Sequence, residues 1–286
     1  MKIAIGTAQF GLDYGVTNAT GRLSDRDCRA ILAMAREFGV ETIDTAIAYG
    51  DAEVRLGAFG IADFRIISKL PAVPPDCADW AAWVLDELEG SLRRLRVERL
   101  DALLLHRPSQ LLDGSGPAMI EGLLESKRKG LVARIGVSVY APADLEKLVP
   151  MVPLDIVQAP LNVLDRRFVQ SGWLLRLARA GIAFHARSLF LQGLLLATER
   201  LPAFSKYDFL LDEWSRWTSN HGTSRVEAAV RFVSAHPEVE CAVVGVESAE
   251  HLKEVVHASQ RPPINCPERI SSDDELLLNP SLWNLT

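Results

Sequence analysis

Short, strongly apolar, β-prone segments alternate with longer amphipathic segments along almost the whole chain of 286 residues. Eight of the short segments are predicted strands, because each is a compact apolar run of the kind found in parallel strands covered on both faces. Strands that alternate with helices in this way indicate an α/β fold with a parallel sheet. The predicted strands cover 2–7, 42–45, 65–70, 100–106, 135–139, 156–160, 182–187 and 241–246.

The amphipathic segments between these strands predict helices. The first begins after Ser24, a residue type that caps helix N-termini, and ends before Gly39, a residue type that follows helix C-termini. The other predicted helices cover 51–59, 79–94, 117–129, 142–149, 171–180, 224–236 and 249–257.

Eight strands with intervening helices in a chain of this length indicate a (β/α)8 barrel, formed as one domain over 1–286. The alternative is a doubly wound open sheet, which usually has a glycine-rich turn after its first strand when it binds a dinucleotide. The segment GTAQFG at 6–11 does not have the GxGxxG spacing of that turn. We therefore expect the barrel, wrapped by a tail of about residues 262–286 that is rich in Pro, Asn and Ser.

Charge and cysteine content limit the partners and the compartment. The formal net charge of −6 at pH 7 is unfavourable for nucleic-acid or anionic-membrane partners, which select for clustered Lys and Arg. The four cysteines form no CxxC pair, so we expect no disulfide and no metal site. No apolar run is long enough for a signal peptide or a membrane span. We expect a soluble cytoplasmic protein, either a monomer or a small homo-oligomer.

Four polar side chains lie at or just after the ends of consecutive predicted strands. Asp44 ends the second strand, Tyr49 lies in the loop that follows it, Lys69 ends the third strand and His106 ends the fourth. Active sites of (β/α)8 barrels lie at the C-terminal ends of the strands, where the βα loops begin. We therefore expect these four side chains around one cavity.

This set of side chains suits proton transfer to or from an oxygen atom. The Tyr49 phenol has an ordinary pKa of about 10, and a nearby Lys69 ammonium would lower it. Asp44 would keep the lysine charged and fix its position, and His106 would hydrogen-bond the substrate oxygen. Tyr49 would then protonate that oxygen in a reduction and remove its proton in an oxidation.

The motifs around these residues resemble those of the aldo-keto reductase superfamily, from Lys2 to about His257. DTA at 44–46 with YGDAE at 49–53 and LG at 56–57 is similar to the family's first signature, and ISK at 67–69 to its lysine strand. SLRRL at 91–95 with HRP at 106–108 is similar to its histidine strand. The resemblance implies a (β/α)8 fold, a nicotinamide cofactor NAD(P)(H) bound in an extended form, a carbonyl or alcohol substrate, and no metal.

The same resemblance implies which residues contact the cofactor. Ser138 and Gln158 match the residues that hold the nicotinamide carboxamide, whereas Val139 stands where Asn is usual. Arg187 stands where many members have an aromatic residue that stacks on the nicotinamide ring; a planar guanidinium can also stack, and a structural salt bridge is the alternative. Asn162 matches an asparagine of the family, for which a structural role is the alternative to cofactor contact. Further contacts are implied at the pyrophosphate loop and the adenosine end, at Thr7, Ser188, Leu189, Gln192, Gly193, Gly245, Ser248 and Glu254.

The adenosine end favours NAD over NADP. Gly245 and His251 stand where NADP-preferring members often have Lys or Arg, which a 2′-phosphate needs. Glu247 nearby strengthens this preference, while Lys253 keeps NADP open as the alternative.

The segment 6–18 resembles a bacterial subgroup associated with sugar metabolism and surface-polysaccharide synthesis, so we expect a sugar-like or small aldehyde substrate. An alternative function is that of a cofactor-binding regulatory subunit with little turnover, as for some barrels of this family. Candidate pocket walls are Phe10, Tyr14 and Trp283, with packing in the core or on the surface as the alternative for each, and candidate partners for substrate hydroxyl groups are Gln9 and Asp13.

Overall fold

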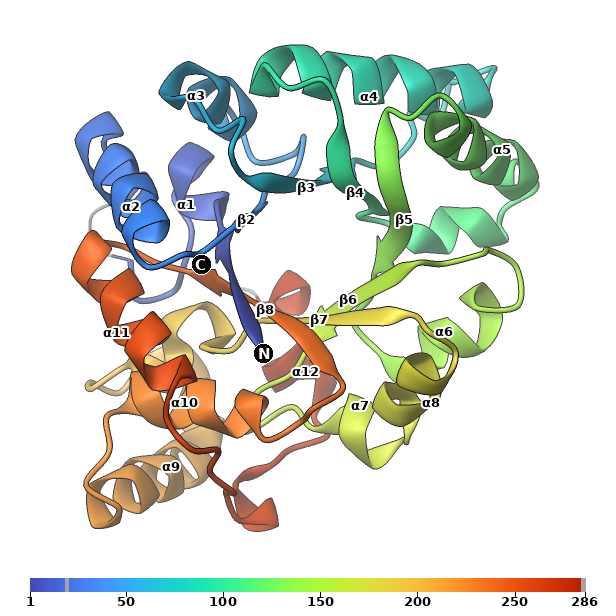
Figure 1. Ribbon diagram of the computed structural model, residues 1–286. Helices are drawn as coiled ribbons and strands as arrows, with labels where there is room; N and C mark the ends of the chain where they lie inside the picture. The colour runs from blue at the N-terminus through green and yellow to red at the C-terminus, as the bar shows by residue number, and fades with distance from the viewer. Residues whose placement is uncertain (19–20, 284–286) are drawn as a thin grey trace.

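The computed structural model, which describes residues 1–18 and 21–283, contains a closed barrel of eight parallel strands in the order β1 to β8. Strand β8 pairs with β1 over five residue pairs, from Lys2 with Cys241 to Gly6 with Gly245, which closes the ring. Figure 1 shows the strands in the middle and the helices around them. The strands are β1 Lys2–Gly6, β2 Thr42–Asp44, β3 Arg65–Leu70, β4 Leu100–Leu105, β5 Val132–Ser138, β6 Ile156–Pro160, β7 Ala183–Arg187 and β8 Val239–Gly245.

The predicted (β/α)8 fold is therefore confirmed, with all eight predicted strands present. Strands β3 and β6 have the predicted bounds. Five other strands, β1, β2, β4, β5 and β8, end one residue before the predicted end, where the backbone leaves the ladder for the βα loop.

The helices form the outer layer, and the first predicted helix shows why they occur where they do. Ser24 caps it by accepting a hydrogen bond from the Asp27 backbone N–H at 3.2 Å, and Gly39 follows it with a φ of +68°. The helices are α1 Ala8–Gly11, α2 Asp25–Glu37, α3 Ala52–Phe59, α4 Trp80–Leu95, α5 Gly116–Arg128, α6 Pro142–Leu148, α7 Arg167–Gln170, α8 Trp173–Arg179, α9 Asp208–Asn220, α10 Arg225–Ser234, α11 Ala249–Ser259 and α12 Glu275–Leu278.

Helix α9 is missing from the sequence prediction, although its apolar residues have helical spacing. Leu210, Trp214 and Trp217 recur at intervals of four and three residues, and all three are buried. The Trp214 indole N–H donates to the Leu195 carbonyl at 2.9 Å, which ties α9 to the loop after β7. The loop between β7 and β8 is thus partly a packed helix.

The barrel interior and the layer between strands and helices are separate apolar regions. Ile67, Ala102, Leu104 and Ile156 form one interior cluster, while a much larger core lies between the strands and the surrounding helices. Side chains two residues apart on a strand point to the same face. Ile67 on β3 and Leu104 on β4 point into the barrel. The side chains two residues further on, Lys69 and His106, are therefore also directed toward the barrel axis.

The C-terminal tail packs on the barrel through backbone and charged contacts. Arg166 donates to the Cys266 and Pro267 carbonyls at 3.0 and 2.9 Å, and Asp274 accepts from Lys206 and Tyr207 at 2.9 and 2.8 Å. Residues 284–286 of the predicted tail lie outside the described residues. None of the helices in the described part of the chain combines the length and apolar character needed to cross a bilayer.

Candidate active site

A cavity of about 870 Å³ lies at the C-terminal end of the barrel strands, where (β/α)8 enzymes carry their active sites. Its volume is in the range of pockets that enclose small molecules and cofactors. The predicted site residues in its wall are Thr7, Asp44, Tyr49, His106, Ser138, Gln158, Arg187, Ser188, Leu189, Gln192, Gly193 and Gly245.

Lys69 lies beneath this wall and is almost completely buried, with 1% of its side chain exposed. Its Nζ donates to Asp44 Oδ1 at 2.5 Å and to the Thr45 carbonyl at 2.9 Å. The other Asp44 oxygen accepts from Gln158 Nε2 at 2.7 Å. Burial lowers the pKa of Lys69 and the Asp44 carboxylate raises it, so the ion pair depends on both partners.

Tyr49 lies between the buried lysine and His106. Lys69 Nζ is 5.4 Å from the centroid of the Tyr49 ring, and the His106 ring meets that ring edge-on at 5.8 Å. Burial raises the pKa of Tyr49, the Asp44 carboxylate raises it further, and the Arg187 guanidinium lowers it.

The expectation that Lys69 lowers the pKa of Tyr49 is therefore wrong for this structure. Its ammonium hydrogen-bonds Asp44 and the Thr45 carbonyl instead, and the loss of solvent around the phenol has the larger effect. Tyr49 is a protonated phenol at neutral pH and is able to donate a proton.

His106 is a neutral imidazole in this site. Burial lowers its pKa to about 3, and the nearby cations Lys69, Arg187 and Arg107 act in the same direction. Its ring can hydrogen-bond an oxygen atom, but it holds no extra proton to donate at physiological pH.

Glu53 fixes the helix that follows Tyr49, a role that the sequence did not reveal. Its buried carboxylate accepts from Ser68 and Ser91, both at 2.6 Å, and pairs with Arg94 at 2.7 Å. Because Ser68 precedes Lys69 on β3, one carboxylate links the Tyr49 loop, the lysine strand and α4.

Two loops meet at the other end of the cavity. The Val16 N–H, after β1, donates to the Gln192 carbonyl, after β7, at 2.9 Å. Gln192 and Gly193 have φ values of +54° and +93°, and a β-carbon on Gly193 would lie 2.0 Å from Thr17 Oγ1. Asn162 has a structural role here, because its Nδ2 donates to the Ser188 carbonyl at 3.0 Å.

Ser248 and Glu254 lie outside the cavity wall. Ser248 caps α11 by accepting from the His251 N–H at 3.1 Å, and Glu254 accepts from Ser224 Oγ at 2.9 Å. The adenosine end of the wall is formed instead by Glu247 and by the His251 ring, which stacks on Phe190 at 5.6 Å.

Of the candidate substrate-side residues, the cavity wall includes Tyr14 and Gln9. Three others were wrongly predicted. Phe10 is fully buried in the core, Trp283 meets Phe204 edge-on at 4.7 Å, and Asp13 accepts from the Arg22 N–H at 2.7 Å.

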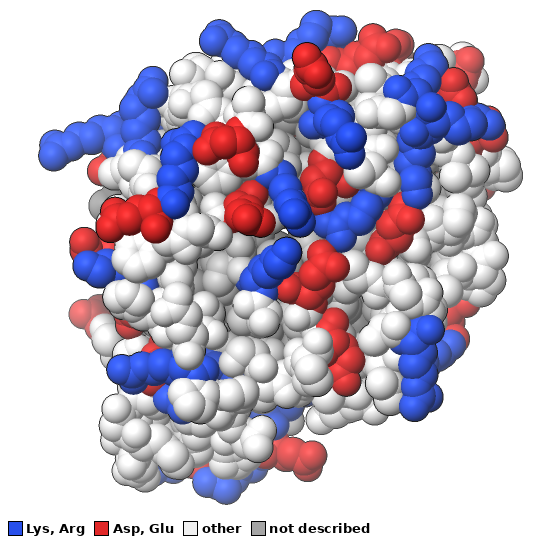
Figure 2. Space-filling model, in the orientation of Figure 1, with Lys and Arg blue, Asp and Glu red and all other residues white. Residues whose placement is uncertain are grey.

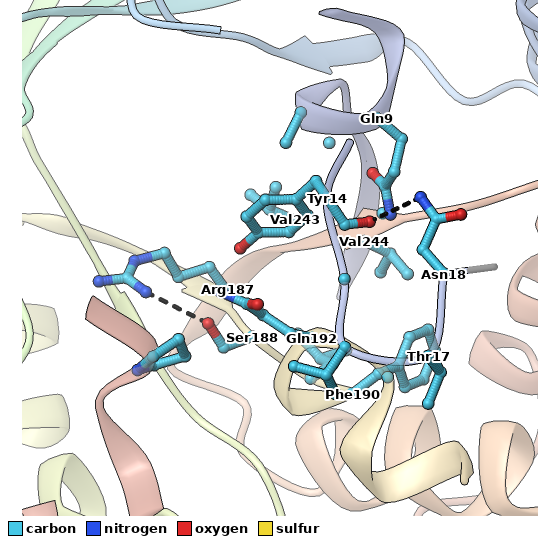
Figure 3. A pocket seen from close by; sticks show the side chains of 18 of the residues that line it. Gln9, Tyr14, Thr17, Asn18, Arg187, Ser188, Phe190, Gln192, Val243 and Val244 are labelled. Carbon is cyan, nitrogen blue, oxygen red and sulfur yellow. Dashed lines mark hydrogen bonds between the residues drawn. The ribbon is translucent and has the colours of Figure 1, made fainter. Parts of the chain in front are cut away.

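Arg187 enters the cavity from the end of β7 and is in contact with Tyr140, a wall residue that the sequence did not reveal. Its guanidinium carbon lies 4.1 Å from the centroid of the Tyr140 ring, while its Nη atoms donate to the Val139 carbonyl at 3.0 Å and to Ser188 Oγ at 3.2 Å. Figure 3 shows this side chain with Tyr14 nearby. Arg187 forms no ion pair with any described residue, so the salt-bridge alternative is wrong.

Neither the surface charges nor the possible metal ligands of the described residues indicate a further binding site. On the face shown in Figure 2, basic and acidic side chains are interspersed. Within residues 1–18 and 21–283, no group of three or more His, Cys, Asp or Glu side chains is arranged to hold a metal ion. The metal-free reaction remains a prediction.

Comparisons with known proteins agree with this geometry. The family model described as Aldo/keto reductase family matches residues 2–266. The chain is 28% identical over 187 residues to Aldo-keto reductase YhdN of Bacillus subtilis, covering 59% of this chain and 53% of the relative, or about half its length. It is 26% identical over 274 residues to the L-glyceraldehyde 3-phosphate reductase of Escherichia coli K12, covering 80% of this chain and 78% of that protein.

Among solved structures, the holo form of an aldo-keto reductase from Bacillus halodurans has the same fold. It superimposes with a TM-score of 0.74 at 19% sequence identity, over 100% of this chain and 93% of that chain.

Proposed function

The chain belongs to the aldo/keto reductase family, and from this membership we propose that it interconverts a sugar-like or small aldehyde or ketone with the corresponding alcohol, with Tyr49 as the general acid and base. Members of this family are oxidoreductases that act on small carbonyl compounds with NAD(P)H. The observation that carries the proposal is that Tyr49 and His106 share one cavity wall directly over the buried pair of Lys69 and Asp44.

The residues of the wall have different roles in the proposed reaction. When bound, the nicotinamide cofactor supplies or accepts the hydride. His106, held neutral, hydrogen-bonds the substrate oxygen, and the Tyr49 phenol gives that oxygen its proton in the direction of reduction. The buried pair of Lys69 and Asp44 supports the Tyr49 ring, with Lys69 Nζ 5.4 Å from its centroid, and Asp44 keeps Lys69 charged and in place.

The cavity wall suits an extended dinucleotide. The Gln9 Oε1 atom is buried in this wall without a hydrogen-bond partner, and a β-carbon on Gly245 would lie only 2.9 Å from the Gln9 amide. The part of the cavity beside Gln9 and Gly245 is therefore narrow and polar. We propose that Ser138 and Gln158 hold the nicotinamide end, and that the loop from Ser188 to Gly193 holds the pyrophosphate.

We propose NAD as the preferred cofactor. The adenosine end has Glu247 and a His251 ring stacked on Phe190 in its wall, and burial lowers the pKa of that imidazole, so the described residues of this end offer no cation for a 2′-phosphate. Lys253 lies in a separate groove beside Glu250 and Glu254. Ser248 and Glu254, the other cofactor contacts implied at this end, both lie outside the wall.

A sugar-like substrate is supported by the Escherichia coli relative, whose name states that it reduces L-glyceraldehyde 3-phosphate. Tyr14 and Tyr140 are available beside the reacting groups, and Pro280 and Ser281 of the tail complete the wall. The cytoplasmic location and the monomeric or small homo-oligomeric state remain predictions.

The test is a panel of sugar and short-chain aldehydes with NADH and with NADPH, followed by absorbance of the reduced nicotinamide, for the wild type and Tyr49→Phe. We expect turnover by the wild type and a loss of about 10²–10⁴-fold in the variant, as for removal of a general acid. Tight cofactor binding without turnover of any substrate would instead support the alternative, a regulatory subunit.

A further inference from the structure

We propose that Arg187 binds an anionic oxygen group of the substrate, a carboxylate or a phosphate, so that the preferred substrates are anionic aldehydes or ketones. This inference rests on the proposed function, since it names the substrate class of the same site. It goes beyond it, because a sugar-like carbonyl compound need not carry a charge.

Arg187 is the one permanently cationic side chain among the described residues of the cavity wall. The two imidazoles of the wall, His106 and His251, are neutral at physiological pH because burial lowers the pKa of both. Asp44 in the wall is already paired with Lys69. The wall also contains the carboxylates Glu199 and Glu247, and among the described residues neither forms an ion pair with Arg187. The Arg187 charge beside Tyr49 is therefore not paired with a carboxylate of the wall.

The guanidinium of Arg187 has unused donors. Arg55 and Arg167 are paired with the carboxylates Asp25 and Asp165, and buried Arg166 uses its donors on three backbone carbonyls. Arg187 instead makes one hydrogen bond to a carbonyl and one to a hydroxyl, while a guanidinium carries five N–H donors. Its Nε is buried without any partner. Donors left unpaired in a cavity are costly, and an anionic ligand satisfies the Nη donors with charge-assisted hydrogen bonds.

The guanidinium is also held in place before any ligand binds. Its central carbon lies 4.1 Å from the centroid of the Tyr140 ring, and it donates hydrogen bonds to the carbonyl of Val139, just after β5, and to the hydroxyl of Ser188, just after β7. A fixed planar fork of this kind matches carboxylate and phosphate oxygens better than a flexible ammonium does.

A competing occupant of this site is the phosphate of the cofactor, and the direction of the side chain argues against it. Figure 3 shows the Arg187 guanidinium turned away from Phe190 and Thr17, which lie at the loop proposed for the pyrophosphate. Two of its contacts, Val139 and Tyr140, follow β5, while its hydrogen bond to Ser188 Oγ, at 3.2 Å the longer of the two, reaches the first residue of that loop. The charge is also close enough to the reacting groups to lower the pKa of Tyr49 and of His106.

The experiment compares matched neutral and anionic aldehydes: butanal with 4-oxobutanoate, and glyceraldehyde with its 3-phosphate. The variants are Arg187→Met, which removes the charge, and Arg187→Lys, which keeps the charge without the fork. Arg176→Met is the control, because Arg176 is an exposed arginine on α8 paired with Glu146 at 2.8 Å.

We expect kcat/KM of the wild type to be higher for the anionic member of a pair, and Arg187→Met to lose about 10- to 100-fold more on that member than on the neutral one. Arg187→Lys should keep part of the preference, and Arg176→Met all of it. The carboxylate and phosphate pairs together show which anion is preferred.

Two further measurements separate this inference from the proposed function. The dissociation constant of NADH is followed by tryptophan fluorescence in the wild type and Arg187→Met, because Arg187 stands at the position implied to contact the nicotinamide ring. The inference predicts that the ratio of kcat/KM for the anionic to the neutral aldehyde falls in the variant, whereas weaker NADH binding with equal losses on both aldehydes would overturn it in favour of a cofactor contact. Binding of the unreactive dianion succinate is measured by calorimetry. If no aldehyde is turned over, the proposed function fails. Succinate binding to the wild type that is lost in Arg187→Met would still support the anion site. A wild type that does not bind succinate would refute the anion site.

Discussion

The α-carbon of Gly11 packs directly against the carbonyl oxygen of Tyr49, so that a β-carbon on Gly11 would lie 1.9 Å from that oxygen. The contact is reciprocal, because Gly50 has a φ of +56° and a β-carbon there would lie 2.5 Å from the Gly11 carbonyl oxygen. Short helix α1 after β1 therefore sets the position of the loop that carries Tyr49. Only residues without a β-carbon allow this approach.

Substitution of Gly11 by Ala should displace the Tyr49 loop. We expect kcat to fall by about 100-fold, because a shift of about 1 Å at a reacting group costs that much, and the free energy of unfolding to fall by about 1–3 kcal/mol. Steady-state kinetics and urea unfolding measure the two effects. Gly39→Ala is the control: Gly39 has a positive φ but open space around it, so it should lose stability and keep kcat. A Gly11→Ala enzyme with normal kcat would contradict the proposed role.

The raised pKa of Tyr49 predicts different pH profiles in the two directions. Reduction needs the protonated phenol, which persists until the pH approaches the raised pKa, so kcat/KM for reduction should be flat from pH 6 to pH 9. Oxidation needs the deprotonated form, whose fraction grows tenfold per pH unit below the pKa, so kcat/KM for oxidation should rise throughout this range. A fall in the reduction rate between pH 7 and pH 9 would show that the pKa of Tyr49 is not raised in the working enzyme.

The pair of Lys69 and Asp44 should behave as a unit in unfolding. Asp44→Asn or Lys69→Met alone leaves a buried charge without its partner, and each should cost about 3–5 kcal/mol of stability. The double variant should be less destabilised than the sum of the two single variants. Urea unfolding of all four proteins completes the double-mutant cycle, and strict additivity would exclude the coupling.

The imidazole of His106 should make the protein less stable in acid. The unfolded chain binds a proton at His106 below about pH 6.5, whereas the folded protein does so only near pH 3. Stability from this group is therefore complete above pH 6.5 and is lost as the pH falls toward 3, by at most about 1.4 kcal/mol per pH unit. The same dependence should be shallower in His106→Gln when unfolding is measured between pH 4 and pH 7; an unchanged slope would refute the assignment.

Features that depend on local spacing could be predicted from the sequence. The strands were visible as compact apolar runs, and Lys69 and His106 follow Ile67 and Leu104 by two residues, so their inward direction follows from strand geometry. The cap at Ser24 is equally local.

Features that depend on contact between distant segments could not be predicted. The fit of Gly11 against Tyr49, the three partners of Glu53 and the position of Tyr140 over Arg187 join segments that are far apart in the chain. The direction of the Tyr49 pKa depends on how deeply the phenol is buried, which composition and periodicity do not encode. Phe10 was misassigned for a similar reason, because an aromatic residue after a strand can face either the cavity or the core.

Lys69, Asp44 and Gln158 all come from the strands themselves, and Asp44 in the cavity wall accepts hydrogen bonds from the other two. Tyr14 and Tyr140, in contrast, belong to loops that only meet above them. The buried support and the loop side chains above it thus come from different parts of the chain. An exchange of the loops that carry Tyr14 and Tyr140 would leave that support, and the separate loop of Tyr49, in place.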